Sequence, residues 1–492
     1  MKKQSQKKSK RKIIIRNLLI LLLIIYLSVF FFNLTKPLPE GISIESEIYN
    51  ISEQEIDFLY DLTYFNKTTG EKISEQEVFD SVFNLVNNAN RFIILDMFLF
   101  NKDYSEQSHF RPLTSELKDS LIKKKLENPN IDIHFTTDEI NNFYGSYTAN
   151  EIQELRDNDI PVIITKMERL RDSNPSYSAL WRILFQPFGT SGEGWIKHPL
   201  GNSQEKVTLR SILKVFNAKS NHRKLIIADS NSEIHTIVTS GNPHDASSRH
   251  SNVAFLIKED IWQSVYESEE AVARFSGTEI PKTDTSFVKP SLVSNKDLQV
   301  QFLTEGKIRS NLIKDIDSTE EGESIDLATF YFSDRKIISS LLKASNRGVS
   351  IRIVLDPNKD AFAREKSGVP NRPAAYELVK KSKGKIKIRW YETKGEQFHT
   401  KLIIINKKGK TIVHLGSANY TKRNLGDLNL EADIKLISPE DKALISEISE
   451  YFENIYNNKK GNYTLDFEDY KDTSKLRYFQ YRIQEFTGKS TF

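Results

Sequence analysis

One set of five polar residues occurs twice in this chain, and the second set follows the first at a constant offset of 177 positions. The first set is His222, Lys224, Ser240, Asn242 and Asn252, and the second is His399, Lys401, Ser417, Asn419 and Asn429. The neighbouring strings agree as well, because HRKLIIAD matches HTKLIIIN and TSGN matches GSAN. A constant offset over so many positions indicates a duplicated unit. It predicts two related halves, each of which supplies half of one composite active site.

The regions between the motifs alternate between helical and strand patterns in the same order in both halves. The first half predicts helices at 78–89, 112–126 and 152–158, and strands at 91–100, 130–138, 161–166 and 224–229. The second half predicts helices at 311–322, 334–348 and 375–384, and strands at 324–334, 349–356, 385–392 and 401–406. Because the strands are short and rich in Ile and Val, we expect an α/β fold whose central strands are covered by helices on both faces.

The length of 492 residues is sufficient for two hydrophobic cores. We expect a first domain at 45–285, a second domain at 290–460 and a C-terminal tail at 461–492 that packs against a domain. The boundary is expected near residues 280–297, where the sequence is polar, contains proline and shows no periodicity.

Each motif places an imidazole beside an ammonium group, because residues two apart on a strand point to the same face. An imidazole can attack phosphorus or protonate a leaving oxygen, and a lysine offsets charge on the non-bridging oxygens. The Ser and Asn residues follow the next expected strand and can donate hydrogen bonds to the same oxygens. A single His-x-Lys is common on protein surfaces, but two copies with the same downstream residues indicate chemistry on a phosphate.

Composition narrows the classes of function. Cysteine is absent, which excludes disulfides, thiolate catalysis and cysteine metal sites. Nine of the 70 Lys and Arg residues lie within residues 1–36, which contain no acid, so 61 basic residues face 66 acidic ones in the remainder. This mildly acidic body argues against nucleic acid as the substrate.

The N-terminal region predicts a membrane anchor. A basic tail at residues 1–12 precedes 20 predominantly apolar residues at 13–32, about the length that crosses a bilayer as a helix. Arg16 lies near one end, where its side chain can reach the headgroups. No small-residue cleavage site follows, which favours an uncleaved anchor over a signal peptide. The positive charge before the span places the N-terminus inside the cytoplasmic membrane and the catalytic domains outside.

The first half contains an insertion of about 41 residues, at roughly 167–217, that the second half lacks. It includes Trp181 and Trp195, with Arg and Lys residues between the aromatic ones. Two interpretations remain open. The insertion is either a small subdomain with its own core, or a lid or membrane-contacting element, because Trp and Arg favour the membrane interface.

The two H-x-K motifs, each with Asp or Asn five residues after the lysine and a following G-S-x-N or its variant, resemble the duplicated motif of the phospholipase D superfamily. Within that superfamily the chain is most similar to bacterial cardiolipin synthase-like and phospholipase D-like membrane proteins, over roughly residues 70–460. The resemblance implies two α/β domains related by pseudo-twofold symmetry, one active site between them, no metal or other cofactor, and a covalent phosphohistidine. It assigns the nucleophile to His222 and the acid to His399, with the reverse order as the alternative.

Some positions depart from the family pattern. Asn406 replaces the Asp that the first copy has at Asp229, and Thr239 replaces a glycine. Glu431 resembles the carboxylate that orients a catalytic imidazole, but at the offset of 177 its counterpart is Ala254. We therefore expect one orienting carboxylate, with Asp229, Asn406, Asn252 and Asn429 as supporting residues. His244, Asp245 and His250 are further candidates for the missing carboxylate's role.

The sequence thus predicts a membrane-anchored phosphodiesterase or phosphatidyltransferase that acts on phospholipid in a bilayer. Water as the acceptor gives hydrolysis and an alcohol gives headgroup exchange, and the sequence does not distinguish the two. A nuclease of the same superfamily and a catalytically inactive scaffold are the alternatives. The sequence sets no oligomeric state.

Overall fold

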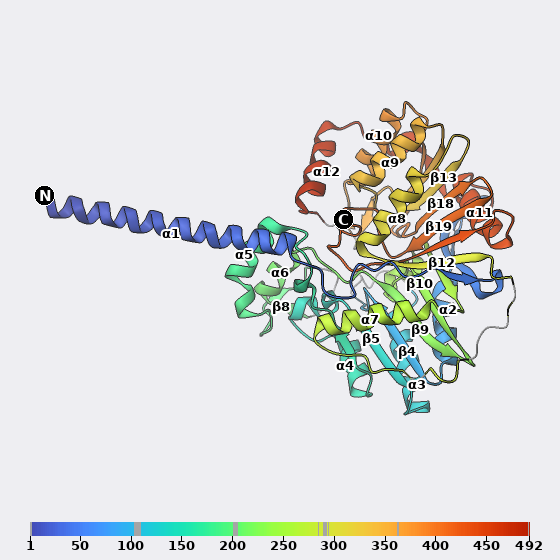
Figure 1. Cartoon of the computed structure of the whole chain (residues 1–492), viewed down its shortest axis with the longest axis horizontal. Coiled ribbons are helices and arrows are strands. Elements are labelled where there is room, and N and C mark those ends of the chain that lie inside the picture. Colours follow the sequence, from blue (N-terminus) through green and yellow to red (C-terminus); the bar gives the residue numbers. More distant parts are fainter. Residues whose placement is uncertain are drawn as a thin grey trace.

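The chain folds as a mixed α/β protein with two large sheets and one long N-terminal helix (Figure 1). This computed structural model describes residues 2–102, 110–199, 205–283, 285–288, 293, 295–361, 364–490 and 492. Parts of the expected boundary (284, 289–292 and 294) and of the insertion (200–204) therefore lie outside the described residues.

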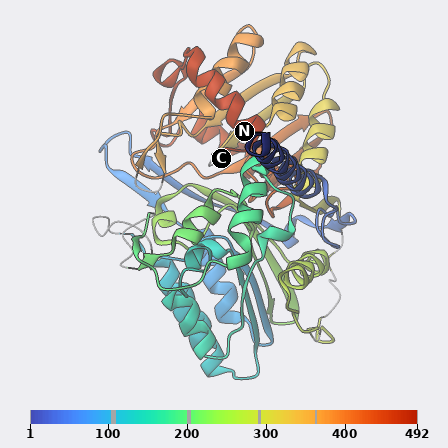
Figure 2. The ribbon, with the colours of Figure 1, turned by 90° about the vertical axis from the view of Figure 1, so that its left-hand side faces the viewer.

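Helix α1 (Lys2–Thr35) projects away from the body of the protein (Figures 1 and 2). Its segment Ser9–Thr35 is long and apolar enough to cross a membrane, and the rest of the protein buries none of its apolar window. Near its C-terminal end α1 contacts α5 (Pro175–Leu184), where the Tyr26 hydroxyl donates to the carbonyl of Ser176 at 3.1 Å. The expected apolar helix at 13–32 is thus present.

The two sheets share one strand order. The first sheet runs β3-β2-β11-β10-β9-β4-β5-β6, and the second runs β1-β12-β20-β19-β18-β13-β14-β17-β21. The first consists of β2 (Ile56–Phe65), β3 (Lys72–Glu75), β4 (Phe92–Met97), β5 (Asp132–Thr137), β6 (Val162–Ile164), β9 (Lys224–Ser230), β10 (Glu233–Thr239) and β11 (Asn252–Ile257). The second consists of β1 (Tyr49–Ile51), β12 (Leu298–Thr304), β13 (Ser324–Thr329), β14 (Ser350–Leu355), β17 (Lys387–Tyr391), β18 (Lys401–Lys407), β19 (Lys410–Gly416), β20 (Ala432–Ser438) and β21 (Thr464–Asp466). Strands β2, β11, β10, β9, β4, β5 and β6 therefore correspond in order to β12, β20, β19, β18, β13, β14 and β17.

The pairing directions also correspond. Strands β4, β5 and β6 are parallel to one another, as are β13, β14 and β17. The motif strands β9 and β18 pair antiparallel with β4 and β13 and begin at the motif lysines. Two short two-stranded sheets are separate: β7 (Ile196–Lys197) with β8 (Lys206–Val207), and β15 (Asp360–Ala361) with β16 (Arg364–Glu365).

Helices cover the outer face of each sheet. Against the first sheet pack α2 (Val78–Asn88), α3 (Leu113–Glu127) and α4 (Asn150–Asp157), and against the second pack α8 (Glu305–Asp317), α9 (Arg335–Asn346) and α10 (Asn371–Lys381). The other helices are α6 (Leu209–Val215), α7 (Trp262–Ser276), α11 (Ala443–Tyr456) and α12 (Lys475–Thr487). Short 3-10 helices span Glu53–Glu55, Glu139–Gly145, Met167–Arg169, Gln186–Phe188, Asp245–Arg249 and Phe467–Tyr470.

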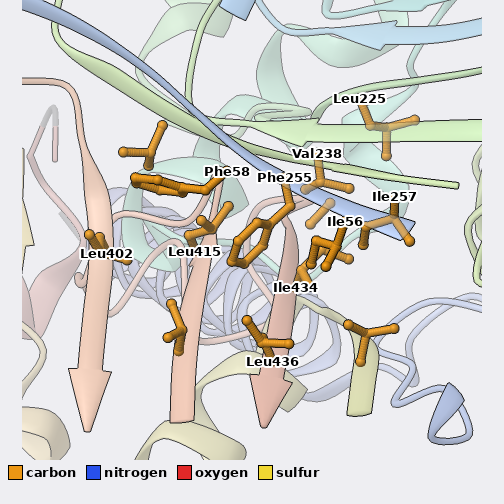
Figure 3. Packing of buried hydrophobic residues seen from close by; sticks show 14 of the residues in the cluster. Ile56, Phe58, Leu225, Val238, Phe255, Ile257, Leu402, Leu415, Ile434 and Leu436 are labelled. Carbon is orange, nitrogen blue, oxygen red and sulfur yellow. The ribbon is translucent and has the colours of Figure 1, made fainter. Parts of the chain in front are cut away.

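The inner faces of the two sheets pack against each other, with Phe58 and Phe255 of the first sheet against Leu415 and Ile434 of the second (Figure 3). The prediction of helices on both faces is right for the outer faces and right in part for the inner ones, where α7 contacts β6, β9 and β10 and α11 contacts β2. The remaining apolar part of the inner faces lies between β10 and β11 of one half and β18, β19 and β20 of the other, which bury each other. Residues of α7 and α11 add to this layer.

The insertion contains α5, α6 and the β7–β8 pair. Trp181 on α5 is buried at 3% exposure, whereas Trp195 is 70% exposed. The two tryptophans therefore have different environments. Trp181 belongs to the packed interior, and only Trp195 is available for contact outside the protein.

Candidate active site

Both motif histidines lie where the backbones of the two halves meet. Asn221 forms a parallel bridge with Leu430, and the backbone amide of His222 donates to the carbonyl of Leu430 at 2.9 Å. In the other half, Phe398 forms the equivalent bridge with Ser251. These crossings bring the rings of His222 and His399 together, with their centroids 6.5 Å apart.

Each imidazole has a side-chain partner from the opposite half. Nδ1 of His222 lies 3.0 Å from a carboxylate oxygen of Glu431, and Nδ1 of His399 lies 3.3 Å from Oδ1 of Asn252. A partner on Nδ1 holds the proton there, which leaves Nε2 of a neutral ring as the basic nitrogen. The site is therefore composite at the level of single hydrogen bonds.

The partner positions show that the offset of 177 does not hold through the whole motif. The amide of Ser240 donates to the carbonyl of Val253, and the amide of Ser417 donates to that of Ala432, both at 2.9 Å. Val253 and Ala432 are thus equivalent, which makes Asn252 the counterpart of Glu431. The predicted pairings of Glu431 with Ala254 and of Asn252 with Asn429 are wrong, because the loop before the strand is two residues longer in the second half.

Asn429 consequently has a separate place. Its Oδ1 accepts from the backbone amide of Ser220 at 3.1 Å, two residues before His222, and Asn429 lines the pocket. It supports the approach to the first motif from the opposite half.

The motif serines lie behind the imidazole partners. The Ser417 hydroxyl donates to Glu431 and accepts from the amide of Ala432 at 3.0 Å. The Ser240 hydroxyl donates to Oδ1 of Asn252 at 3.4 Å and accepts from the amide of Val253 at 3.0 Å. Both serines are fully buried and neither lines the pocket, so their expected contact with the substrate phosphate stays a prediction. Their hydroxyls are positioned to orient the partner of each imidazole.

The motif lysines are fully buried beneath the histidines. Nζ of Lys224 donates to the carbonyl of His222 at 2.6 Å, and Nζ of Lys401 donates to that of His399 at 2.7 Å. Burial lowers the pKa of Lys224 to about 7, although the carboxylate of Glu431 acts in the opposite direction. Burial, together with the charge of Lys224, lowers the pKa of Lys401 well below its ordinary value.

Burial also shifts the pKa values of the two histidines and of Glu431. Burial, followed by the nearest lysine, lowers the pKa of both His222 and His399 well below the ordinary range. Burial also raises the pKa of Glu431 to about 7. The buried site thus disfavours the protonated forms of its histidines and lysines. A bound anion between the rings favours these protonated forms, and they in turn stabilise the anion.

The two imidazoles open into one pocket with a cavity volume of about 120 Å³. The two motif asparagines that the sequence indicated, Asn242 and Asn419, line this pocket. Oδ1 of Asn242 accepts from the backbone amide of Leu99 at 3.3 Å. The side-chain nitrogen Nδ2 of Asn242 therefore points away from Leu99. Within the described part of the chain, Oδ1 of Asn419 is buried without a hydrogen-bond partner.

The positions five residues after the lysines hold the strands in place. The carboxylate of Asp229 accepts from the backbone amides of Asn90, Arg91 and Phe92, immediately before and at the start of β4. Nδ2 of Asn406 donates to the hydroxyl of Ser324, at the start of β13, at 3.2 Å. Both side chains thus join equivalent neighbouring strands, far from the imidazoles in the sheet.

Two aspartates fix the entry to each motif strand. Asp138 caps the 3-10 helix after it and also accepts from the amide of Asn221 at 2.7 Å. Asp356 accepts from the amide of Phe398 at 2.8 Å. Each carboxylate therefore holds the residue that precedes a motif histidine, Asn221 before His222 and Phe398 before His399.

His244 and His250 line the pocket, and burial lowers the pKa of each to about 3, so they are neutral. Asp245 instead accepts from the amide of Thr114 at the start of α3. Asn252 occupies the place opposite Nδ1 of His399, so none of these three substitutes for an orienting carboxylate.

Several pocket residues were not predicted from the sequence. Phe98 and Phe330 pack against the two histidines with centroid distances of 4.8 and 5.2 Å, and their rings also lie near the motif lysines. The repeated strings FLF and FYF at the ends of equivalent predicted strands are a signal for this pair. Arg423 and Phe492 also line the pocket, and no repeated pattern marks them.

A buried ion network behind the site was also missed. Arg223 donates to Glu269 at 2.9 Å and to Glu305 at 2.8 Å, and Glu305 accepts from the backbone amide of Glu431 at 3.0 Å. The network therefore joins the residue after His222 to the carboxylate that His222 contacts. Among the described residues, no group of three or more His, Asp or Glu side chains is placed to hold a metal ion.

Comparisons with known proteins concern the second half of the chain and the overall fold. Residues 312–456 match the family described as "Cardiolipin synthase, PLD-like domain". Over these residues the chain is similar to that family, and the match includes the second H-x-K motif. A comparison with curated proteins gives no significant match.

Two solved structures are similar to this chain to different extents. Phosphatidylserine synthase from Haemophilus influenzae Rd KW20 is similar with a TM-score of 0.58 and 10% identity, over 90% of this chain and 95% of that one. Nuc from Salmonella typhimurium, a phospholipase D family member, is 25% identical over 34% of this chain and 97% of its own, with a TM-score of 0.27. The first likeness extends over both sheets and shows that the fold is shared.

Proposed function

We propose that this chain is a membrane-anchored phospholipase D-type phosphodiesterase or phosphatidyltransferase that acts on phospholipids through a phosphohistidine. The observation that carries the proposal is the pair of imidazoles with centroids 6.5 Å apart in one pocket, each held by a residue of the opposite half. That separation leaves room for one tetrahedral phosphate between the rings. It also suits displacement with the entering and leaving groups on opposite sides of phosphorus.

In the first step, Nε2 of neutral His222 attacks phosphorus while His399, protonated when the anionic substrate is bound, donates its proton to the leaving alcohol oxygen. The P–N bond forms, the P–O bond to the alcohol breaks, and the alcohol leaves neutral. Glu431 supports the nucleophile, because a carboxylate on Nδ1 stabilises the positive charge that the ring acquires on attack.

In the second step, water or an acceptor alcohol attacks the phosphohistidine from the side of His399. His399, now neutral, takes the proton of the attacking oxygen, and the P–N bond to His222 breaks. Water gives hydrolysis and an alcohol gives a new phosphodiester. The lysines and the motif asparagines are proposed to stabilise negative charge on the non-bridging oxygens in both steps.

Phospholipid is the proposed substrate class for two reasons. The matched family is described by cardiolipin synthase, and the solved relative of similar fold is named phosphatidylserine synthase. In addition, α1 provides a helix long and apolar enough to anchor the protein at a bilayer. Tethering raises the effective concentration of lipid around the site. The basic residues before the span favour an inside N-terminus and an outward-facing catalytic body at the cytoplasmic membrane.

The test is incubation of the purified full chain with phosphatidylglycerol vesicles and, separately, with single-stranded DNA. Phosphatidic acid and glycerol are the products expected from hydrolysis, and cardiolipin and glycerol from transfer to a second phosphatidylglycerol. DNA fragments without lipid products would favour a nuclease. No product from either substrate would favour an inactive scaffold. Both DNA cleavage without lipid products and the absence of any product would contradict the proposal. The mechanism uses no metal, so activity that EDTA abolishes and a divalent ion restores would contradict its chemistry.

A further inference from the structure

A second, larger cavity lies beside the catalytic pocket. Its volume is about 920 Å³, within the range of sites that hold small organic ligands. Elements far apart in the sequence form its wall: α1, α5, α6, residues 366–369, α12 and the segment after α12. Apolar side chains dominate this wall, including Tyr177, Leu180, Leu213, Val215, Phe216 and Val369.

This cavity adjoins the catalytic pocket. Phe492 lines both cavities, and its ring lies 6.1 Å from that of Tyr331, which lines the catalytic pocket. Lys366 lines the larger cavity and donates to the hydroxyl of Tyr331. A thin partition of side chains thus separates the apolar chamber from the proposed phosphate position.

The chamber also adjoins the membrane-spanning helix. Tyr26 of α1 lines it, and the Tyr26 hydroxyl bonds to Ser176 at the start of α5. Tyr26 precedes Phe32, the end of the apolar run, by six residues. At a rise of 1.5 Å per residue this is about 9 Å along the helix. When α1 spans a bilayer with Phe32 at the edge of the hydrocarbon, the start of α5 therefore lies about 9 Å inside that edge, beside the acyl chains.

The two helices beside the chamber expose apolar side chains. On α5, Leu180 and Leu184 are 47% and 53% exposed. On α12 the exposed apolar residues are Leu476, Phe479, Ile483 and Phe486, which share one helical face. Both helices lie on the side of the body from which α1 extends (Figure 1). Soluble surfaces seldom expose such residues together, whereas a membrane-facing surface does.

We infer that the chamber between α5 and α12 binds acyl chains of a phospholipid whose phosphate lies between His222 and His399. This inference rests on the proposed function and specifies how the substrate is held. The lipid enters from the outer surface of the bilayer along α1. Its hydrocarbon stays in the apolar chamber while its phosphate passes the partition at Phe492 into the catalytic pocket.

The test uses monomeric phosphatidylglycerol with hexanoyl or octanoyl chains, below the concentration at which it forms micelles, so that vesicle binding plays no part. Burial of one methylene group changes an equilibrium about fourfold. We expect kcat/KM of the full-length protein to be at least about tenfold higher for octanoyl than for hexanoyl lipid. Leu180→Asp, which places a charge on the chamber wall, should reduce this ratio to about two or less.

Leu184→Asp is the matched control, because Leu184 lies one turn further along α5 with similar exposure but does not line the chamber. It should keep the chain-length ratio of the unchanged protein. Equal ratios in all three proteins would overturn the inference while leaving phospholipid turnover, and so the proposed function, intact.

A second measurement is independent of turnover. Phosphatidylglycerol with a photoreactive diazirine at the end of one acyl chain is bound to the full chain in detergent and irradiated, and labelled peptides are identified. Label within residues 175–184, 209–218 or 480–490 is expected. Label confined to α1, as for a lipid that merely surrounds the span, would overturn the inference even if the protein turns over lipid. Chamber labelling without any turnover would support the acyl-chain site and count against the proposed chemistry alone.

Discussion

The two halves of the site have nearly the same backbone and hydrogen-bond pattern but differ in the group that faces the imidazole. On one side of the site the contacts run from Ser417 to Glu431 and from Glu431 to His222. On the other side they run from Ser240 to Asn252 and from Asn252 to His399. The first partner is a carboxylate and the second is a neutral amide. Duplication has preserved geometry in both halves while the charge beside each ring has diverged.

The residues behind the two imidazole partners also differ. Extending the strand register shows that Asp61 beside Asn252 corresponds to Glu305 beside Glu431. Nδ2 of Asn252 donates to Asp61 at 3.0 Å, so a carboxylate exists near His399 but acts through an amide. A carboxylate in direct contact favours a ring that acquires positive charge by attack. An amide orients a ring without fixing its charge, which suits a residue that first gives and then takes a proton.

The largest expected effect comes from removing either ring. His222→Ala should lower kcat by about 10⁴-fold or more, and His399→Ala by about 10² to 10⁴-fold with natural lipid. Because the rings act as one unit, the double variant should be little worse than His222→Ala. Turnover is measured by release of the headgroup from phosphatidylglycerol.

A substrate with a p-nitrophenyl leaving group separates the two roles, since this group departs without an acid. His399→Ala should then retain the substrate's phosphoryl group on the protein, detected by mass spectrometry, whereas His222→Ala should not. Retention in His222→Ala and not in His399→Ala would reverse the assignment of nucleophile and acid. Near-normal activity in either variant would contradict the hypothesis that the two histidines form one composite active site.

Replacing the carboxylate while keeping its shape should have the next largest effect. Glu431→Gln retains an oxygen that can face Nδ1 of His222 but removes the charge that stabilises the phosphorylated ring. By analogy with carboxylate-to-amide changes beside catalytic histidines, kcat should fall by about 10² to 10⁴-fold. The matched control is Glu485→Gln, a buried carboxylate on α12 that contacts Ser333 and lies outside the pocket lining. Equal loss in both variants would indicate a structural effect only.

The comparison can also be inverted at the second ring. The double variant Asp61→Asn with Asn252→Asp moves the carboxylate into direct contact with Nδ1 of His399 without changing the number of carboxylates. A carboxylate stabilises the imidazolium, so the pKa of His399 should rise by about one to three units. The acid form then persists to higher pH, and the descending limb of the kcat/KM profile should move upward. A profile identical to that of the unchanged protein would show that His399 does not supply the proton.

Sequence reasoning identified the fold class and most of the strands and helices around the motifs, because their apolar periodicity is strong and repeated. It missed β2, β11, β12 and β20, of which β11 begins with Asn252 and β20 follows directly after Glu431. It expected helices on the inner faces, where α7 and α11 do lie, but not the direct contact between the two sheets. A strand's apolar run does not reveal whether a helix or another sheet covers it.

The site was predicted to the level of residues but not of contacts. A fixed offset counts positions along the chain, so it could not register the two additional residues in the loop before Glu431. It therefore paired Glu431 with Ala254 and not with Asn252. The serines were expected on the phosphate because hydroxyls commonly bind oxyanions. Their burial behind the partner residues depends on β11 and β20, which the sequence pattern did not resolve.

A smaller effect should distinguish the two lysines. Burial lowers the pKa of Lys224 to about 7, so the free site loses this charge as pH rises through that value. An anion binds the protonated form. The inhibition constant of dimethyl phosphate, whose single charge is constant over this range, should therefore rise up to about tenfold per pH unit above pH 7. Lys224→Ala should weaken this dependence without removing it, because the Glu431 carboxyl, whose pKa burial raises to about 7, ionises over the same range. Lys401→Ala should leave the dependence unchanged, and the opposite pattern would transfer the role to Lys401.

The smallest expected effect concerns the insertion, which only the first half carries. Trp195 is largely exposed, so Trp195→Ala should weaken binding to anionic vesicles by about tenfold or less, with stability nearly unchanged. Trp181 is buried at 3% exposure, so Trp181→Ala should lower the free energy of unfolding by about 3–5 kcal/mol. Vesicle sedimentation and thermal unfolding separate the two outcomes, although α1 must be present in every protein compared. If Trp195→Ala alters unfolding and leaves vesicle binding unchanged, the insertion is a packed subdomain and its membrane contact is limited to α5.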